Sequence, residues 1–188
     1  MPILHAPILE QAGFTLGSQG GSNSYVYRLD GVNNYYQLSD PISILVGDIV
    51  EISFIGGNVT NSFATLIGTT NFAARFDTDT TSTFLREQGL QATLNGSPVD
   101  SGTTNVPTSG FNKASLSILT AGVLEQITSI SGARLINLPV YNFKVIRGGT
   151  VIHEIPLTNK AQGATQLPTI GSVSATIVGY NENDWEEV

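Results

Sequence analysis

A pattern of alternating side chains around two adjacent glycines constrains the fold of this chain more than any other feature. Apolar residues occupy every second position from Tyr141 to Val145, and a similar alternation resumes after Gly148-Gly149. Glycine accepts the positive φ angles of a tight turn, so this stretch predicts a β-hairpin. Pro156 cannot donate a hydrogen bond to a neighbouring strand, and we therefore expect the second strand to end there.

Short extended segments with turn signals between them recur along the rest of the chain. Asn95-Gly96 is the preferred pair for a type I′ turn, and Asp40-Pro41 is expected to interrupt a strand. The helical period of 3.6 is absent over three turns, and residues 178–187 are the best helical candidate. Closely spaced strands of this kind favour two packed antiparallel sheets. The predicted strands, besides the hairpin, are 25–30, 35–38, 42–46, 49–55, 63–68, 71–76, 82–86, 90–94, 97–99, 114–119 and 123–130.

Composition excludes several classes of protein. Charged residues make up 12% of the 188 residues, and hydrophobic residues make up 40%, which suits a β-rich protein with hydroxylated strand surfaces. The net charge is −7 with eight basic residues scattered along the chain, so a nucleic-acid partner is not expected. Cysteine is absent, which rules out disulfides and thiolate metal sites. No apolar run approaches the roughly 20 residues of a membrane span, and no membrane insertion is expected.

The first 21 residues differ from the rest of the chain. They combine apolar side chains with two prolines and a Gly/Ser-rich run, which indicates an extended arm and linker ahead of a sandwich domain at residues 22–188. The segment lacks the basic start of a secretory signal peptide. Its apolar residues are expected to pack on the chain's own domain or on a neighbouring subunit or particle. They are Ile3, Leu4, Ile8, Leu9 and Phe14.

Two stretches resemble the laminin-G-like, concanavalin A-like jelly-roll family. Residues 27–38, Tyr-Arg-Leu-Asp-Gly-Val-Asn-Asn-Tyr-Tyr-Gln-Leu, are similar to the family's opening strand and turn, with residues 49–54 as the next strand. Residues 141–145 and 152–156 are similar to its closing strands, particularly in copies from bacteriophage virion proteins. Phe111-Asn112-Lys113 stands where the family usually has a Trp-His pair. The resemblance implies an all-β, two-sheet antiparallel jelly-roll sandwich.

The resemblance also directs the functional hypotheses. The first is a non-enzymatic bacteriophage virion surface protein that decorates the capsid or forms part of the tail. It implies a homo-oligomer, expected to be a trimer, in contact with other virion proteins. The second is a carbohydrate-binding adhesin or lectin that recognises a cell-surface glycan. The third is a glycoside hydrolase or lyase, kept only because the fold hosts such enzymes.

Aromatic residues near the start of the sandwich are the candidate carbohydrate site, because a flat ring matches the C–H face of a sugar. Consecutive residues of a strand point to opposite faces, so one of Tyr35 and Tyr36 is expected in the core and the other at the surface. The four candidates are Tyr25, Tyr27, Tyr35 and Tyr36.

Acidic residues suggest two further sites, each with a simpler alternative. Asp77 and Asp79 offer oxygen ligands for Ca²⁺, but an ordinary polar turn is the favoured interpretation. Glu182, Asp184 and Glu187 fit the spacing of a retaining glycosidase, but a solvated acidic tail is the favoured interpretation, so no catalytic residue is assigned. The two histidines, His5 and His153, lack neighbours at ligand spacing and are expected to be structural or to lie at the surface.

Overall fold

The hairpin predicted around Gly148-Gly149 is present at the edge of a six-stranded sheet in the computed structural model of the chain. The structure describes residues 24–60, 64–78, 83–99 and 104–188, with the backbone alone at 77, 78 and 83–87. Gly148 and Gly149 have φ angles of 56° and 80°, the two positive values that a type I′ turn requires. The second strand ends at Pro156, as predicted.

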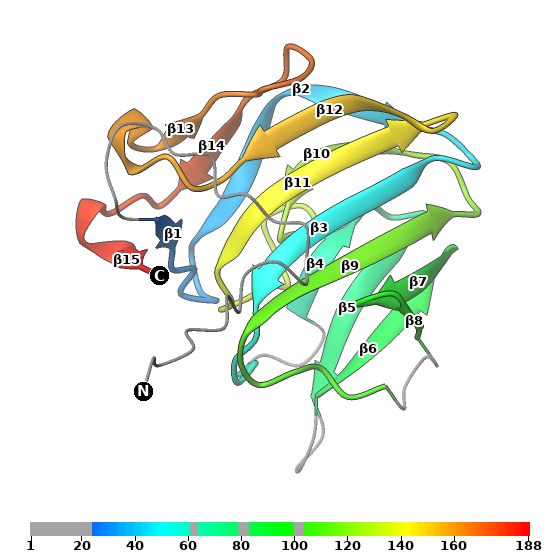
Figure 1. Cartoon of the computed structure of the whole chain (residues 1–188), viewed down its shortest axis with the longest axis horizontal. Coiled ribbons are helices and arrows are strands. Elements are labelled where there is room, and N and C mark those ends of the chain that lie inside the picture. Colours follow the sequence, from blue (N-terminus) through cyan, green and yellow to red (C-terminus); the bar gives the residue numbers. More distant parts are fainter. Residues whose placement is uncertain (1–23, 61–63, 79–82, 100–103) are drawn as a thin grey trace, which may run out of the picture.

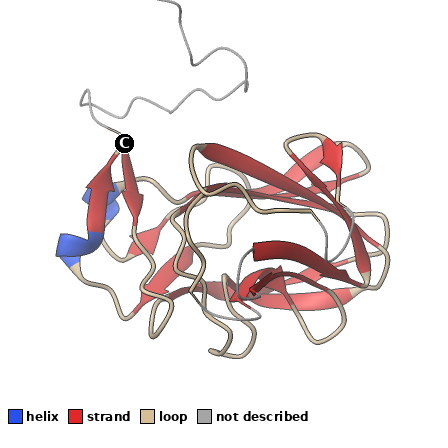
Figure 2. Cartoon of the chain, turned by 90° about the horizontal axis from the view of Figure 1, so that it is seen from below, coloured by secondary structure: helices blue, strands red, loops and turns tan. Residues whose placement is uncertain are grey.

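The described strands build two large antiparallel sheets that face each other (Figure 1). After a quarter turn the strands are seen in two layers (Figure 2), so the predicted all-β sandwich is confirmed. The six-stranded sheet has the order β12 (Thr150–Pro156), β11 (Val140–Arg147), β3 (Ile49–Ile55), β9 (Phe111–Ile118), β7 (Leu90–Leu94) and β8 (Ser97–Pro98). The seven-stranded sheet has the order β13 (Thr165–Gln166), β14 (Ala175–Val178), β2 (Tyr35–Ile44), β10 (Gly122–Ile127), β4 (Ala64–Gly68), β5 (Ala73–Thr78) and β6 (Thr83–Gln88).

A small third sheet joins the first described strand to the last. Strand β1 (Tyr25–Tyr27) pairs with β15 (Trp185–Glu187), which follows the short 3₁₀ helix η3 (Glu182–Asp184). The helical candidate at residues 178–187 is therefore wrong, because residues 185–187 pair with β1 as a strand and only the single turn of η3 is helical. The other 3₁₀ helix is η2 (Lys160–Gln162). The described residues contain no helix with the length and apolarity to cross a membrane.

The core lies between the two large sheets and is filled from both sides. Tyr36, Ile44, Ile52 and Phe143 are fully buried there. Phe54 of the six-stranded sheet meets Phe76 of the seven-stranded sheet edge-on, with ring centroids 5.7 Å apart. Burying each large apolar side chain contributes roughly 1.5–3 kcal/mol, so the face-to-face packing is the main source of stability.

Two turns carry the chain from one sheet to the other. The turn at Gly47-Asp48 leads from β2 to β3, and the one ending at Gly122 leads from β9 to β10. The corners are bonded together, since Gly47 N donates to Ile118 O at 3.0 Å and Ile118 N donates to Asp48 O at 2.9 Å. These turns therefore fasten the two layers at one end of the sandwich.

The interruption predicted at Asp40-Pro41 does not occur, and β2 continues through both residues. The register between β2 and β10 shifts at this point, with Gln37 opposite Gln126 and Ile42 opposite Leu124. A proline is tolerated in a strand where the ladder is irregular, because its missing N–H has no partner to lose. The proline alone was thus a misleading signal.

Candidate functional site

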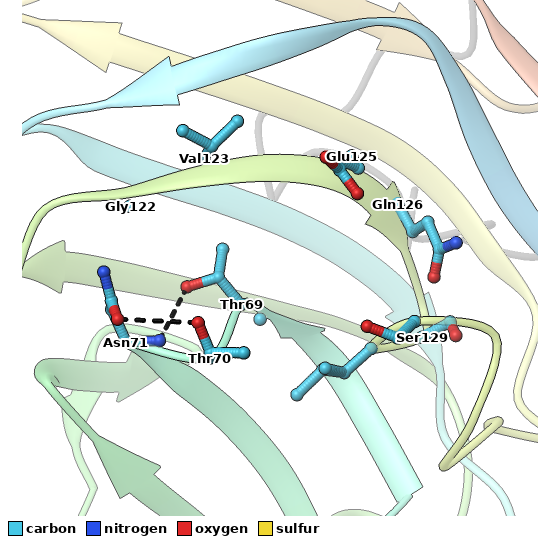
Figure 3. A pocket seen from close by; sticks show the side chains of 11 residues that line it. Thr69, Thr70, Asn71, Gly122, Val123, Glu125, Gln126 and Ser129 are labelled. Carbon is cyan, nitrogen blue, oxygen red and sulfur yellow. Dashed lines mark hydrogen bonds between the residues drawn. The ribbon is translucent and has the colours of Figure 1, made fainter.

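A polar cleft of about 340 Å³ lies where β10 meets the turn between β4 and β5 (Figure 3). It is on the face of the seven-stranded sheet that points away from the core, since Val123 and Glu125 are exposed while Leu124 between them is buried. The lining residues are Gly68, Thr69, Thr70, Asn71, Gly122, Val123, Glu125, Gln126, Ser129, Ile130 and Ser131.

The cleft exists because β10 and β4 separate. They pair at Ile127 and Ile67 alone, whereas β10 pairs with β2 from end to end apart from one bulge. Asn71 closes the far end by donating from Nδ2 to Ala121 O at 2.9 Å. A Cβ on Gly122 would lie 2.8 Å from Thr69 Oγ1, so a residue without a side chain is needed where the strand passes the turn.

The turn that forms one wall is held by its own side chains. Thr69 Oγ1 accepts hydrogen bonds from Asn71 N at 3.0 Å and from Phe72 N at 3.3 Å. The backbone closes the same turn, with Thr69 N donating to Phe72 O at 2.7 Å. Hydroxyl–backbone bonds of this kind fix a turn, so the exposed side chain of Thr70 is presented to the cleft from a rigid support.

The loop of residues 128–135 forms the opposite wall and has an unusual backbone. Thr128, Ser131 and Arg134 have φ angles of 66°, 54° and 56°, and Asn95 is the other non-glycine residue with positive φ in the described chain. Such angles are costly for residues with a Cβ, most of all for β-branched threonine. Strained residues gather at sites where function fixes the backbone, which makes this loop a candidate functional element.

Hydrogen bonds lock the loop into this shape. Ile130 and Ala133 exchange backbone bonds of 3.1 and 3.0 Å around the turn at Ser131-Gly132. The loop is also tied to β4, because Thr65 N donates to Arg134 O at 2.7 Å. The 128–135 loop is therefore held in one conformation before any ligand binds.

Two glutamines connect the loop to the sheet. Gln126 accepts a bond from Gly132 N at 2.9 Å through Oε1 and donates from Nε2 to Gln37 Oε1 at 3.1 Å. Gln37 in turn donates from Nε2 to Glu125 O at 2.9 Å. The amide of Gln126 is thus held in a defined orientation beside the cleft.

A wider hollow of about 440 Å³ lies on the other side of the same loop, lined by Gly31, Val32, Thr60, Gly132, Ala133, Arg134 and Leu135. The 30–34 turn beside it is rigid, because Asp30 Oδ1 accepts bonds from the backbone N–H groups of Val32, Asn33 and Asn34. Partial burial opposes ionisation of Asp30, but these N–H groups stabilise the carboxylate and lower its pKa overall.

Comparisons of this chain with protein-family models, with curated proteins and with solved structures returned no match. The cleft and the hollow are therefore interpreted from their own geometry.

The four tyrosines predicted as a carbohydrate site do not form a common surface. Tyr27 and Tyr36 are fully buried, so their assignment as sugar-stacking residues is wrong. Tyr25 is half-buried and already lies under Lys160, whose Nζ is 4.8 Å from the ring centroid. Tyr35 is half-buried on the outer face, as expected for the neighbour of a core residue. Its hydroxyl lies close to the loop, since a Cβ added at Gly132 would be 3.8 Å from Tyr35 Oη.

Tyr27 has a structural role instead. Its ring stacks on Tyr180 with centroids 5.7 Å apart and meets Trp185 edge-on at 5.4 Å. Its hydroxyl accepts a bond from Asn181 N at 2.9 Å and donates to Asp184 Oδ2 at 3.3 Å. This aromatic cluster attaches the small sheet to the sandwich.

The other predicted residues are not assembled into a site. Asp184 accepts a hydrogen bond from Tyr27. Glu187 is exposed on β15, away from the two large sheets. Asp79, the side chain of Asp77, His5 and the apolar residues Ile3, Leu4, Ile8, Leu9 and Phe14 lie outside the described part of the chain. Within that part, no three His, Asp or Glu side chains come together as metal ligands would.

The residues that line the cleft were missed by sequence reasoning. Thr69, Asn71, Glu125 and Gln126 are ordinary residues for β-strands and turns, and they come from separate segments. The Ser131-Gly132 pair was one available signal, since such a dipeptide marks a turn. That signal indicates a turn and says nothing of a ligand.

Proposed function

We propose that this chain is a non-enzymatic recognition module that binds a glycan in the polar cleft. The observation that carries the proposal is the chemistry of the residues that line the cleft. They bring hydroxyl, amide and carboxylate groups together on rigid backbone segments. Sugars present many hydroxyls that both donate and accept, and side-chain amides and hydroxyls complement them. The volume falls within the range of small-ligand sites, roughly 300–1,000 Å³.

Preorganisation supports the same conclusion. Gln126 is oriented by Gly132 and Gln37, and Asn71 is oriented by Ala121. Side chains already fixed in place lose little conformational entropy when a ligand binds. Glu125 is exposed and can accept bonds from two adjacent sugar hydroxyls.

The proposal is for binding without hydrolysis. Glu125 is the one carboxylate among the residues that line the cleft. Glycoside hydrolysis generally requires two carboxyl groups about 5–9 Å apart. A single carboxylate suits recognition of hydroxyls instead.

Titration of purified protein with a panel of oligosaccharides tests the proposal. A Glu125→Ala/Thr70→Ala double variant removes two exposed cleft groups without touching the core, and we expect the affinity to fall at least about tenfold. The control is Glu182→Ala/Thr150→Ala, which removes the same two residue types from exposed positions elsewhere. Absence of binding across the panel, or equal affinity in the double variant and the control, would contradict the proposal.

We further propose that the module belongs to the surface of a bacteriophage virion, in the capsid or the tail. The support is the resemblance of residues 27–38 to concanavalin A-like jelly-roll domains and of residues 141–145 and 152–156 to the copies of that domain in virion proteins. A glycan-binding module in that position would recognise the host surface. Capsid or tail genes on either side of the coding gene are the expected finding, and a gene neighbourhood of metabolic enzymes would count against it.

The virion proposal includes self-association. We expect a homotrimer, with Ile3, Leu4, Ile8, Leu9 and Phe14 in contact with a neighbouring subunit or with other virion proteins. Sedimentation velocity of the full chain and of a variant without residues 1–21 tests this expectation. A full chain that sediments as a monomer at all concentrations would refute the trimer.

A further inference from the structure

An unpaired cation at the wide hollow indicates which glycans the module would select. Arg134 is exposed, lines the hollow and makes no ion pair with any residue that the structure describes. Four other cationic side chains, Arg28, Lys113, Lys144 and Arg147, each pair with a carboxylate. Lys160 likewise makes no ion pair with a described residue, but its Nζ lies 4.8 Å from the centroid of the Tyr25 ring. In a chain with a net charge of −7, Arg134 is thus a cation free to meet an acidic group of a ligand.

The backbone around Arg134 is fixed before any ligand arrives. Its φ angle of 56° is unfavourable for an arginine, and its carbonyl accepts the 2.7 Å bond from Thr65 N. Arg134 is also the one charged residue among those that line the hollow. The guanidinium therefore extends from a rigid support beside a space that a ligand group can enter.

The cleft and the hollow are two parts of one surface, because they share the 128–135 loop. Ser131 lines the cleft and its neighbour Gly132 lines the hollow. The charges differ between the two sides, with Glu125 in the cleft and Arg134 in the hollow. A ligand that crosses the Ser131-Gly132 turn would meet neutral hydroxyl-binding groups and a carboxylate on one side and a cation on the other.

We infer that the glycan carries an anionic sugar, whose acidic group pairs with Arg134 while a neutral sugar occupies the cleft. This inference rests on the proposed glycan-binding function and adds the chemical class of the ligand. Guanidinium binds carboxylate and sulfate groups through two parallel hydrogen bonds, which gives both affinity and orientation. The overall negative charge of the protein repels an acidic ligand at long range, so the selectivity depends on this local contact.

Matched oligosaccharides test the inference. Titration calorimetry compares a neutral oligosaccharide that the wild type binds with the same chain bearing a terminal uronate and with its sulfated form. We expect at least one acidic form to bind the wild type about tenfold more tightly than the neutral chain, and the stronger of the two identifies carboxylate or sulfate as the preferred group. The advantage should shrink as NaCl is raised from about 0.05 to 0.5 M, because Arg134 is exposed and screened.

Two variants assign the effect to Arg134. Arg134→Gln should bind acidic and neutral chains with equal affinity, while Arg134→Lys should retain part of the preference. Lys113→Gln, which removes an exposed cation on β9 of the six-stranded sheet, is the control. An acidic preference that persists in Arg134→Gln, or a wild type without any preference, overturns the inference and leaves the proposed function standing. A wild type that binds none of the chains refutes both.

Discussion

Arg147 donates two hydrogen bonds to Asp48, with Nε 2.9 Å from Oδ1 and Nη2 2.7 Å from Oδ2. Asp48 is almost fully buried at the corner where the chain passes from β2 to β3, and its Oδ2 also accepts a bond from Leu45 N at 2.8 Å. Arg147 lies at the end of β11 and donates to Ser43 O on β2 as well. The pair therefore links the two sheets at a corner. The hydrogen bonds from Arg147 are the main reason that the pKa of Asp48 is lowered.

Replacement of Asp48 should destabilise the fold markedly. Asp48→Ala leaves Arg147 and Leu45 N without their acceptor, and we expect the free energy of unfolding to fall by about 2–4 kcal/mol. Arg147→Lys keeps the charge but loses the bidentate hydrogen bonding, so the free energy of unfolding should fall by less than in Asp48→Ala. Urea denaturation gives both values. Lys113→Met, which breaks an exposed pair with Glu51, is the control, and a loss in Asp48→Ala no larger than in this control would contradict the role of the corner.

Two buried tyrosines should respond oppositely to loss of their hydroxyl groups. Tyr27 Oη bonds Asn181 N and Asp184, so Tyr27→Phe should cost about 1 kcal/mol. Tyr36 Oη is fully buried and has no hydrogen-bond partner among the described residues, and burial raises its pKa. Tyr36→Phe removes an unsatisfied polar group and should leave stability unchanged or raise it by up to about 1 kcal/mol. Equal losses in the two variants, measured by thermal unfolding, would be inconsistent with these contacts.

His153 should make the fold sensitive to mild acid. Burial is the main cause of its lowered pKa, and the charge of Arg147 adds to it. The unfolded chain then binds a proton more readily than the folded chain, so the stability contributed by neutral His153 is present above about pH 6.5 and is lost as the pH falls through the lowered value. The buried Nδ1 has no hydrogen-bond partner among the described residues to stabilise the charged form. Denaturation midpoints between about pH 7 and 5 should fall for the wild type.

The matched variant for this prediction is His153→Gln, which cannot take up a proton. Its denaturation midpoint should vary less than that of the wild type over the same pH range. An identical pH dependence in the two proteins would mean that another group is responsible.

Asparagine at position 131 should relieve strain in the turn beside the cleft and stabilise the protein. Ser131 and Gly132 have φ angles of 54° and 69°, the geometry of a type I′ turn, in which Asn-Gly is the preferred pair. Ser131→Asn should therefore stabilise the protein by about 0.5 kcal/mol, or about 1–2 °C in Tm. Ser131→Ala provides the comparison, because alanine is poorly suited to this backbone. A Tm no higher in Ser131→Asn than in Ser131→Ala would show that the turn is not under this strain.

Local chemistry explains which parts of the fold could be predicted from the sequence. The turns at Gly148-Gly149 and Asn95-Gly96 were predicted correctly because both residues of each pair suit positive φ and lie between alternating strands. The continuation of β2 through Pro41 depends on an irregular register with β10, a partner more than eighty residues away. Such long-range pairing leaves no mark on the neighbouring sequence.

The candidate site was beyond sequence reasoning for the same reason. The turn at Thr69 and the strand from Gly122 to Ile127 meet only because β4 and β10 are neighbours that pair at a single position. Each segment is unremarkable on its own, and the cleft arises from the gap between them. Alternation correctly predicted that one of Tyr35 and Tyr36 lies in the core but did not indicate which, and the loop that Tyr35 approaches was not foreseen.

The pairing of β1 with β15 has a mechanical consequence. Ser24 O accepts a bond from Val188 N at 2.9 Å, and Tyr25 lies opposite Glu187, so both strands can be grasped at the same end of the ladder. A pulling force applied between these two points would load the bonds one after another, as a zipper opens, rather than all at once in shear. The small sheet should therefore yield at low force, with the aromatic packing of Tyr27 against Trp185 as the first substantial resistance before tension reaches the sandwich.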